Sequence, residues 1–313
     1  MINFRYHVVS ILAVFLALAI GTVMGAAFVG QGVIDGLRDR IDTVEQRADT
    51  IKADNAKTQA ENDRLQAFVD ESAPFTVTGR LTGIRINMVV ERGVSGDAID
   101  AQAALLRGAG ATVPGVVWLE DRWQLGAASD AAALRTATGL TNRSRETLRS
   151  AAAQLLGQRL GAEPPVTDDV LNRLADGGFV TVTGVDGSAD PTVTDFTGTS
   201  ARLLAVGGPG HAVPPIVTTG VAQGAIDANA RVAIAQVFEP SDKTITRDAW
   251  LDVVADTDAL RGRVSTVNDA ESVEGQIGTA LVLDELGRGT FGTYGVDEDR
   301  ALPEYPTPGP VGG

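Results

Sequence analysis

The sequence predicts an α/β protein: an N-terminal transmembrane helix, a parallel coiled-coil stalk, and a mainly parallel open sheet with helices on both faces. Three patterns predict it, namely an uncharged apolar stretch near the start, an unbroken heptad pattern after it, and alternating strand and helix patterns beyond. The predicted parts are a cytoplasmic tip, an anchor, a coiled coil, an extracytoplasmic α/β domain and a disordered Pro/Gly tail, at 1–7, 8–29, 33–72, 75–300 and 301–313.

The anchor is predicted from a segment without Asp, Glu, Lys or Arg that runs from Val8 to Val29. Its about 22 residues would form roughly 33 Å of helix, enough to cross a hydrocarbon core of about 30 Å. Arg5 precedes the segment and the next charge is Asp35, so the positive-inside rule predicts a single-pass protein with a cytoplasmic N-terminus. A cleaved signal peptide is the alternative, with Gly25-Ala26-Ala27 as its cleavage site. A retained anchor is favoured because signal peptides have a shorter apolar core of about 7–15 residues.

Small residues recur at every fourth position on one face of the anchor, at Ala13, Ala17, Gly21 and Gly25. Such a stripe lets two helices approach closely, so it predicts self-association within the membrane. The alternative is that small residues are simply common in membrane helices. Both interpretations stay open.

A heptad pattern follows the anchor, with alternating spacings of three and four residues over about five heptads. The predicted seam consists of Ile34, Leu37, Ile41, Val44, Ala48, Ile51, Asn55, Thr58, Asn62, Leu65 and Val69. With Ile34 at position a, the pattern places Ile and Asn at a and Leu at d, which is typical of parallel two-stranded coiled coils. Two copies anchored in one membrane would also run parallel, so the predicted partner is a second copy of this chain.

The middle of the seam, from Asn55 to Asn62, is polar and is therefore expected to close weakly. It would either control the register or offer a place where a further helix joins the seam. A solvated stalk with no binding role is the simpler alternative.

Composition limits the class of partner and the way in which the globular domain can be stabilised. The 313 residues carry a net charge of −14, which argues against a nucleic-acid partner because phosphate binding needs a basic surface. There are no cysteines. About 235 residues follow the stalk, enough for a domain whose core holds it together without disulfides.

Beyond the stalk, Pro74 is expected to end the long helix. A strand at 81–90, a helix at 97–107 and a strand at 113–119 predict a βαβ unit and hence a parallel sheet. Further strands are expected at 179–182, 203–206, 231–237 and 264–267, and further helices at 130–138, 143–160, 168–174, 216–229, 249–254 and 272–286. The chain from Gly287 onward is expected to be loop and tail.

No catalytic, cofactor or metal-binding set is predicted. Copper prefers Cys, Met and His, and the available ligands, which show no ligand spacing, are Met1, Met24, Met88, His7 and His211. His211 is expected to be solvated in its loop, and Asp168-Asp169 is expected to lie at a helix start rather than to form a catalytic pair. No nucleotide-binding glycine motif is present, so the chain is not expected to be an enzyme. A parallel sheet does offer a crevice at its carboxyl edge, where a small ligand near Glu91–Gly96 or Gly207–His211 is conceivable.

Two stretches carry a resemblance to a known family. They are HVVSILAVFLALAIGTVMG near the start and VSTVNDAESVEGQIGTALVLDELGRGTFGTYG near the end, the latter followed by Leu302-Pro303. Over most of its length the chain resembles the actinobacterial copper transport protein B family of outer-membrane copper efflux proteins. The resemblance implies a role in copper homeostasis and an outer-membrane location. Proteins of similar build also imply a cell-division role, in which the coiled coil recruits or activates a peptidoglycan hydrolase. The family supplies no copper-ligand motif to carry over.

The resemblance also implies a pore across the outer membrane, and such a pore conflicts with the sequence pattern. An outer-membrane pore is expected to be a closed β-barrel, whereas this sequence predicts buried α/β strands and one membrane helix. The sequence therefore favours a dimeric scaffold anchored in a lipid bilayer. Its predicted partners are its own twin and an envelope protein, such as a peptidoglycan hydrolase or its regulator.

Overall fold

The computed structural model describes residues 4–141, 143–163, 167–196, 201–239, 244–247, 249–296 and 298–304, without the side chains of 27–34. Contacts between residues divide the chain into two units, Met1–Phe68 and Val69–Gly313.

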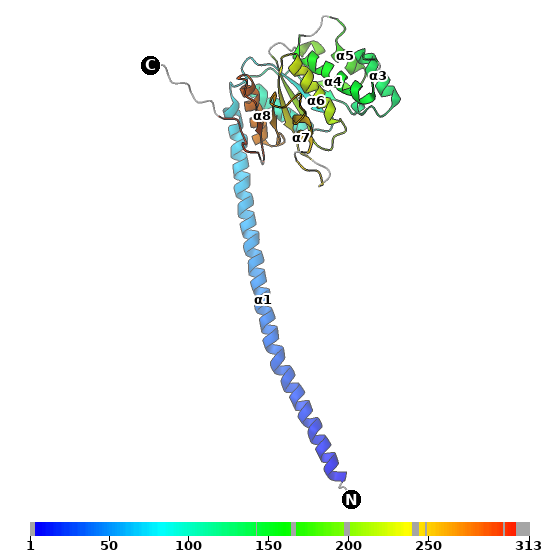
Figure 1. Ribbon diagram of the computed structural model, residues 1–313. Helices are drawn as coiled ribbons and strands as arrows, with labels where there is room; N and C mark the ends of the chain where they lie inside the picture. Colours follow the sequence, from blue (N-terminus) through cyan, green and yellow to red (C-terminus); the bar gives the residue numbers. More distant parts are fainter. Residues whose placement is uncertain are drawn as a thin grey trace, which may run out of the picture. The chain divides into compact units, whose positions relative to one another are not determined.

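Helix α1, Phe4–Val77, makes up the described part of the first unit and continues into the second (Figure 1). Its segment Phe4–Ala26 has a mean hydropathy of 2.5 and is long and apolar enough to cross a membrane. An N-terminal apolar helix that fits a membrane anchor is therefore confirmed, although it begins before the predicted Val8. The cytoplasmic orientation of the N-terminus stays a prediction.

The second unit is built on a mainly parallel seven-stranded sheet, as predicted. In the described residues the strand order is β3-β2-β1-β4-β5-β6-β7, and β3 alone runs antiparallel to its neighbour. The strands are β1 (Ile86–Glu91), β2 (Val116–Leu119), β3 (Val180–Thr183), β4 (Arg202–Gly207), β5 (Arg231–Gln236), β6 (Val264–Val267) and β7 (Thr293–Tyr294).

Helices cover both faces of this sheet, because alternate strand residues enter two separate cores (Figure 1). In β1, Val89 packs with α3 to α7, whereas Met88 and Val90 pack with α2, α8 and the end of α1. The helices are α2 (Gly96–Gly108), α3 (Ala128–Thr138), α4 (Arg145–Gly161), α5 (Val170–Asp176), α6 (Pro215–Asp227), α7 (Ala249–Ala255) and α8 (Val273–Leu286), with 3₁₀ turns η1 (Asp121–Gln124) and η2 (Val193–Asp195).

Several predicted boundaries and one loop assignment are wrong; the strand predicted at 113–119, for example, begins at Val116. Helix α1 does not end at Pro74, because the proline removes only its own donor while Ala73 and Val77 are buried in the domain core. The predicted strand at 81–90 begins only at Ile86, since the left-handed Gly83 turns the chain just before it. Strand β7 lies in the segment expected to be loop, and its two residues are too short to give a periodic pattern.

Candidate functional site

One candidate site lies where the strand order reverses, between β1 and β4. The chain leaves β1 towards β2 and β3 and returns to β4 on the other side. Ligands of open α/β sheets bind at such a point, outside the carboxyl ends of the strands. Here β1 ends at Glu91 and β4 at Gly207, so the two segments singled out in the sequence come together.

The Glu91 carboxylate is the centre of this site and is fully buried. Its Oε1 accepts hydrogen bonds from Thr218 Oγ1 of α6 at 2.5 Å and from Trp250 Nε1 of α7 at 3.1 Å. Its Oε2 accepts from the Gly208 N–H at 3.4 Å. These hydrogen bonds compensate for the hydration that the carboxylate loses when it is buried. Gly207 must be glycine, because a Cβ there would lie 2.5 Å from the Glu91 carboxyl carbon.

His211 stands between this carboxylate and a surface cleft. Its Nδ1 lies 3.5 Å from Glu91 Oε2. Only 14% of its side chain is exposed, so the expectation of a solvated histidine is wrong. A Cβ on Gly93 would approach the imidazole to 2.9 Å, which shows how closely the loop after β1 packs on the ring. No local pattern signals this arrangement, because Glu91 and His211 are far apart along the chain.

The cleft has a volume of about 340 Å³ and is lined by charged side chains and glycines, including Arg92, Gly93, Asp121, His211 and Glu239. Arg92 is held in place by Glu120, to which its Nε donates at 3.1 Å, and by stacking 4.7 Å above the Trp118 ring. The hydrogen bond from Arg92 lowers the pKa of Glu120. One imidazole, one guanidinium and two carboxylates suit a small polar molecule, and such a ligand stays a prediction.

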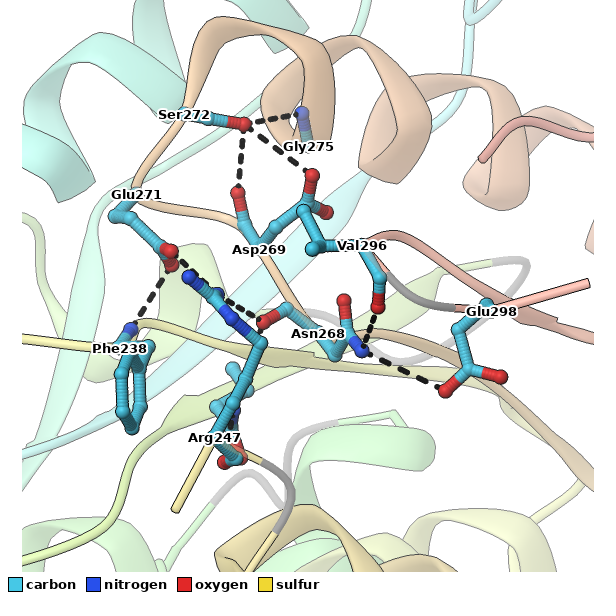
Figure 2. A network of polar contacts seen from close by, with 10 residues as sticks. Phe238, Arg247, Asn268, Asp269, Glu271, Ser272, Gly275, Val296 and Glu298 are labelled. Atoms are coloured by element: carbon cyan, nitrogen blue, oxygen red, sulfur yellow. Dashed lines mark hydrogen bonds and ion pairs between the residues drawn. The ribbon is translucent and has the colours of Figure 1, made fainter. Parts of the chain in front are cut away.

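A second polar network lies at the carboxyl ends of β5 and β6 (Figure 2). Arg247 Nη1 donates to the Asn268 carbonyl oxygen at 2.9 Å and to Glu271 Oε1 at 2.5 Å, and its guanidinium lies 4.7 Å from the Phe238 ring. Glu271 Oε2 in turn accepts from the Phe238 N–H at 2.9 Å. The loop after β5 is therefore fastened to the loop after β6.

Asp269 joins this network to the start of α8. Ser272 caps α8, its Oγ accepting from the Gly275 N–H at 3.0 Å, and lies 3.3 Å from Asp269 Oδ2 (Figure 2). Burial raises the pKa of Asp269, and the neighbouring Glu271 carboxylate raises it further. These residues were not predicted as a site. The signal was a run of polar side chains directly after the strand at 264–267.

Replacing Asp269 by Asn is expected to flatten the pH dependence of stability. Because the pKa in the folded state lies above the ordinary value of 3.8, the folded state binds the proton more tightly, and stability falls as pH rises through that window. The substituted amide would keep an acceptor for Ser272 without the buried charge. We therefore expect a higher free energy of unfolding at pH 7, measured by denaturant titration across pH. The exposed Asp299→Asn is the control; an unchanged profile for Asp269→Asn would contradict the argument.

The potential copper ligands predicted from the sequence lie apart from one another in the chain. Met88 is fully buried in β1, and His7 and Met24 lie on the apolar segment of α1, while Met1 falls outside the described residues. Among described residues, no group of three or more His, Cys, Asp or Glu is arranged to hold a metal ion.

The predicted helix start at Asp168-Asp169 is confirmed for Asp169, which caps α5 by accepting from the Leu171 N–H at 2.9 Å. Its carboxylate also pairs with the buried Arg159 at 2.7 Å. Asp168 has a left-handed backbone and pairs with Arg173. These contacts occupy both carboxylates.

The described large apolar side chains of the predicted seam are exposed to solvent in the first unit. Five of its large residues, Leu37, Ile41, Val44, Ile51 and Leu65, are exposed by 53% or more. Asn55, Thr58 and Asn62 between them are also exposed, while the side chain of Ile34 lies outside the description. Val69, the last seam residue, packs against the core of the globular domain that contains Met88 and Val90.

The small-residue stripe in the apolar segment is equally open. Ala13, Ala17, Gly21 and Gly25 are exposed, and a Cβ added to either glycine would meet nothing within 4 Å. A single chain does not test pairing at the seam or at this stripe, so both stay predictions.

Comparison with known proteins supplies the family. A search of curated proteins gives no match. The family model for the copper transport outer membrane protein MctB matches residues 1–303, nearly the whole chain. The chain therefore belongs to the MctB family of copper transport outer membrane proteins.

Proposed function

We propose that this copper transport family member works in copper homeostasis as a membrane-anchored, parallel dimeric coiled-coil scaffold. In this proposal a single chain does not form the pore. The stalk pairs with a second copy, and the globular domains engage an envelope protein. Family membership supports the connection with copper transport and the membrane.

The observation that carries the proposal is the exposed heptad stripe on α1. Burying a Leu, Ile or Val side chain is worth roughly 1.5–3 kcal/mol, so leaving five of them in water is costly. A second copy offers the same stripe in the same register. Asn55 and Asn62 at position a favour a defined register at some cost in stability.

Two features argue against a pore made by one chain. The described residues contain one helix long and apolar enough to span a membrane, and a single helix encloses no channel. The seven-stranded sheet is open, with both faces covered by helices. A channel would therefore need several copies, and the dimer is the smallest assembly that the stalk supports.

Cysteine cross-linking tests the dimer directly, because the natural chain has no cysteine to interfere. Ile41→Cys and Leu65→Cys in the full-length protein in membranes are expected to form disulfide-linked dimers under mild oxidation. Seam positions in a parallel pair bring the two Cα atoms within the roughly 4.4–6.8 Å that a disulfide spans. Gln46→Cys, on the opposite side of the helix from the seam, is the matched control. Equal cross-linking at positions 41 and 46, or none at either seam position, would overturn the proposal.

A further inference from the structure

The cleft at the carboxyl ends of β1 and β4 carries an excess of negative charge. Two of its lining residues, Asp121 and Glu239, have exposed carboxylates. Within the part of the chain that the structure describes, neither carboxylate makes an ion pair or a hydrogen bond. Both border the same cavity of about 340 Å³ as His211, and this volume lies in the range of small-molecule sites.

Arg92 is a guanidinium in the same cleft, but its charge is already compensated. Its Nε donates to Glu120 Oε2 at 3.1 Å and its Nη2 donates to Glu120 Oε1 at 2.5 Å, which makes the ion pair bidentate. The guanidinium also stacks 4.7 Å from the Trp118 ring, which fixes it in this pairing. Arg92 therefore leaves the charges of Asp121 and Glu239 uncompensated.

The imidazole of His211 adds a hydrogen-bond acceptor to these two carboxylates. Its Nδ1 is buried, has no hydrogen-bond partner among the described residues, and lies 3.5 Å from Oε2 of the fully buried Glu91. The carboxylate favours the neutral tautomer with the proton on Nδ1, and this tautomer keeps a lone pair on Nε2. Because His211 lines the cleft, Nε2 is the ring nitrogen that a ligand there would meet. Glu91 thus acts as a positioning residue for the imidazole.

This set of groups determines the chemistry of the ligand. The cleft offers three acceptor groups, namely one imidazole nitrogen and two carboxylates, and an ammonium group has three N–H donors and a positive charge. A metal ion fits less well, because no group of three or more His, Cys, Asp or Glu in the described residues is arranged to hold one. Hydrogen bonds of about 2.7–3.2 Å reach acceptors that are too widely spaced for metal–ligand bonds of about 2.0–2.6 Å.

We propose that this cleft binds a small primary amine in its ammonium form. His211 Nε2 accepts one N–H of the ammonium group, while Asp121 and Glu239 supply the opposite charge and further acceptors. The carbon chain of the amine lies against Pro209 and Ala212, which also line the cleft. The site belongs to the globular domain, so its occupancy does not depend on pairing along the stalk.

Histidine-selective NMR of the full-length protein in phosphatidylcholine nanodiscs tests the proposal. The chain has two histidines, so ¹⁵N-histidine labelling reports on His7 and His211 alone, and the His211→Gln variant assigns the signals. At pH 8, ethylammonium is expected to shift the Nε2 resonance of His211 saturably and to leave His7 unchanged. Tetramethylammonium, which has the charge without N–H donors, and ethanol, which has no charge, are each expected to bind at least about tenfold more weakly. Equal affinity for tetramethylammonium would overturn the ammonium assignment.

Matched variants locate the binding. Asp121→Asn and Glu239→Gln change exposed side chains, and together they are expected to weaken ethylammonium binding by about tenfold or more. Asp227→Asn removes the same charge from the exposed last residue of α6, outside the cleft, and is expected to leave the affinity unchanged. Absence of a saturable shift of His211 in the natural chain, or equal affinity of the double variant and Asp227→Asn, would refute the assignment.

Discussion

Replacing Glu91 by Ala is expected to lower the free energy of unfolding of the globular domain by about 3–5 kcal/mol. The change removes a fully buried carboxylate and leaves the Thr218 hydroxyl and the Trp250 indole N–H without their acceptor. Each orphaned buried donor costs roughly 1–3 kcal/mol, and the lost volume adds a cavity. Denaturant unfolding followed by tryptophan fluorescence measures the effect, since Trp250 itself contacts the carboxylate.

Glu120→Ala provides the control for this prediction. Glu120 is partly exposed and pairs with Arg92, so its loss is expected to cost about 1 kcal/mol or less. Glu91→Gln removes the charge but keeps the shape of the side chain. It keeps an acceptor for Thr218 but turns an amide N–H towards the Gly208 N–H. The loss in free energy of unfolding should therefore lie between those of Glu91→Ala and Glu120→Ala. Equal stability of Glu91→Ala and Glu120→Ala would contradict the central role assigned to Glu91.

Changing Ile41 and Leu65 together to Asp is expected to abolish the proposed dimer. Each copy loses two apolar side chains worth roughly 1.5–3 kcal/mol apiece and gains two carboxylates facing their counterparts in the partner. The dissociation constant should rise on the order of a thousandfold or more. Analytical ultracentrifugation of the full-length protein in detergent measures the change.

The matched control places the same charges away from the seam. Gln46 and Ala67 are exposed and lie on the other side of the helix in the same heptads. Gln46→Asp with Ala67→Asp should remain dimeric and should still support copper tolerance in cells lacking the natural protein. If the Ile41 and Leu65 variant kept its affinity, the stalk would not be the contact. The small-residue stripe from Ala13 to Gly25 would then be the remaining dimer surface.

The order of strands and helices along the chain was predictable because the sequence signals for them are local. Long apolar runs such as Arg231–Val237 marked the buried parallel strands, and helical periodicity marked α2 and α8. The errors fell where local signals conflict with packing. Pro74 is a helix breaker in isolation, but its turn is held by Ala73 and Val77 in the domain core.

The site was less predictable because its contacts span the chain. The rule for parallel sheets predicted ligand positions after β1 or after β4, and the strand order shows that the two positions adjoin. Nothing local, however, marks Thr218 and Trp250 as partners of Glu91, since they lie 127 and 159 residues further along. The Asp269 network had a local signal, polar residues directly after a strand, but only the fold shows that Arg247 reaches across to it.

The two edges of the sheet have a consequence for the proposed dimer. One edge is the four-residue antiparallel β3, and the other is β7, with only two residues. In the proposed dimer, tethering would raise the local concentration of the two identical domains to about the millimolar range, where long exposed edge strands would pair with each other. Such short edge strands offer few free backbone groups for pairing between domains. The two globular domains can therefore lie close together and still remain separate folding units.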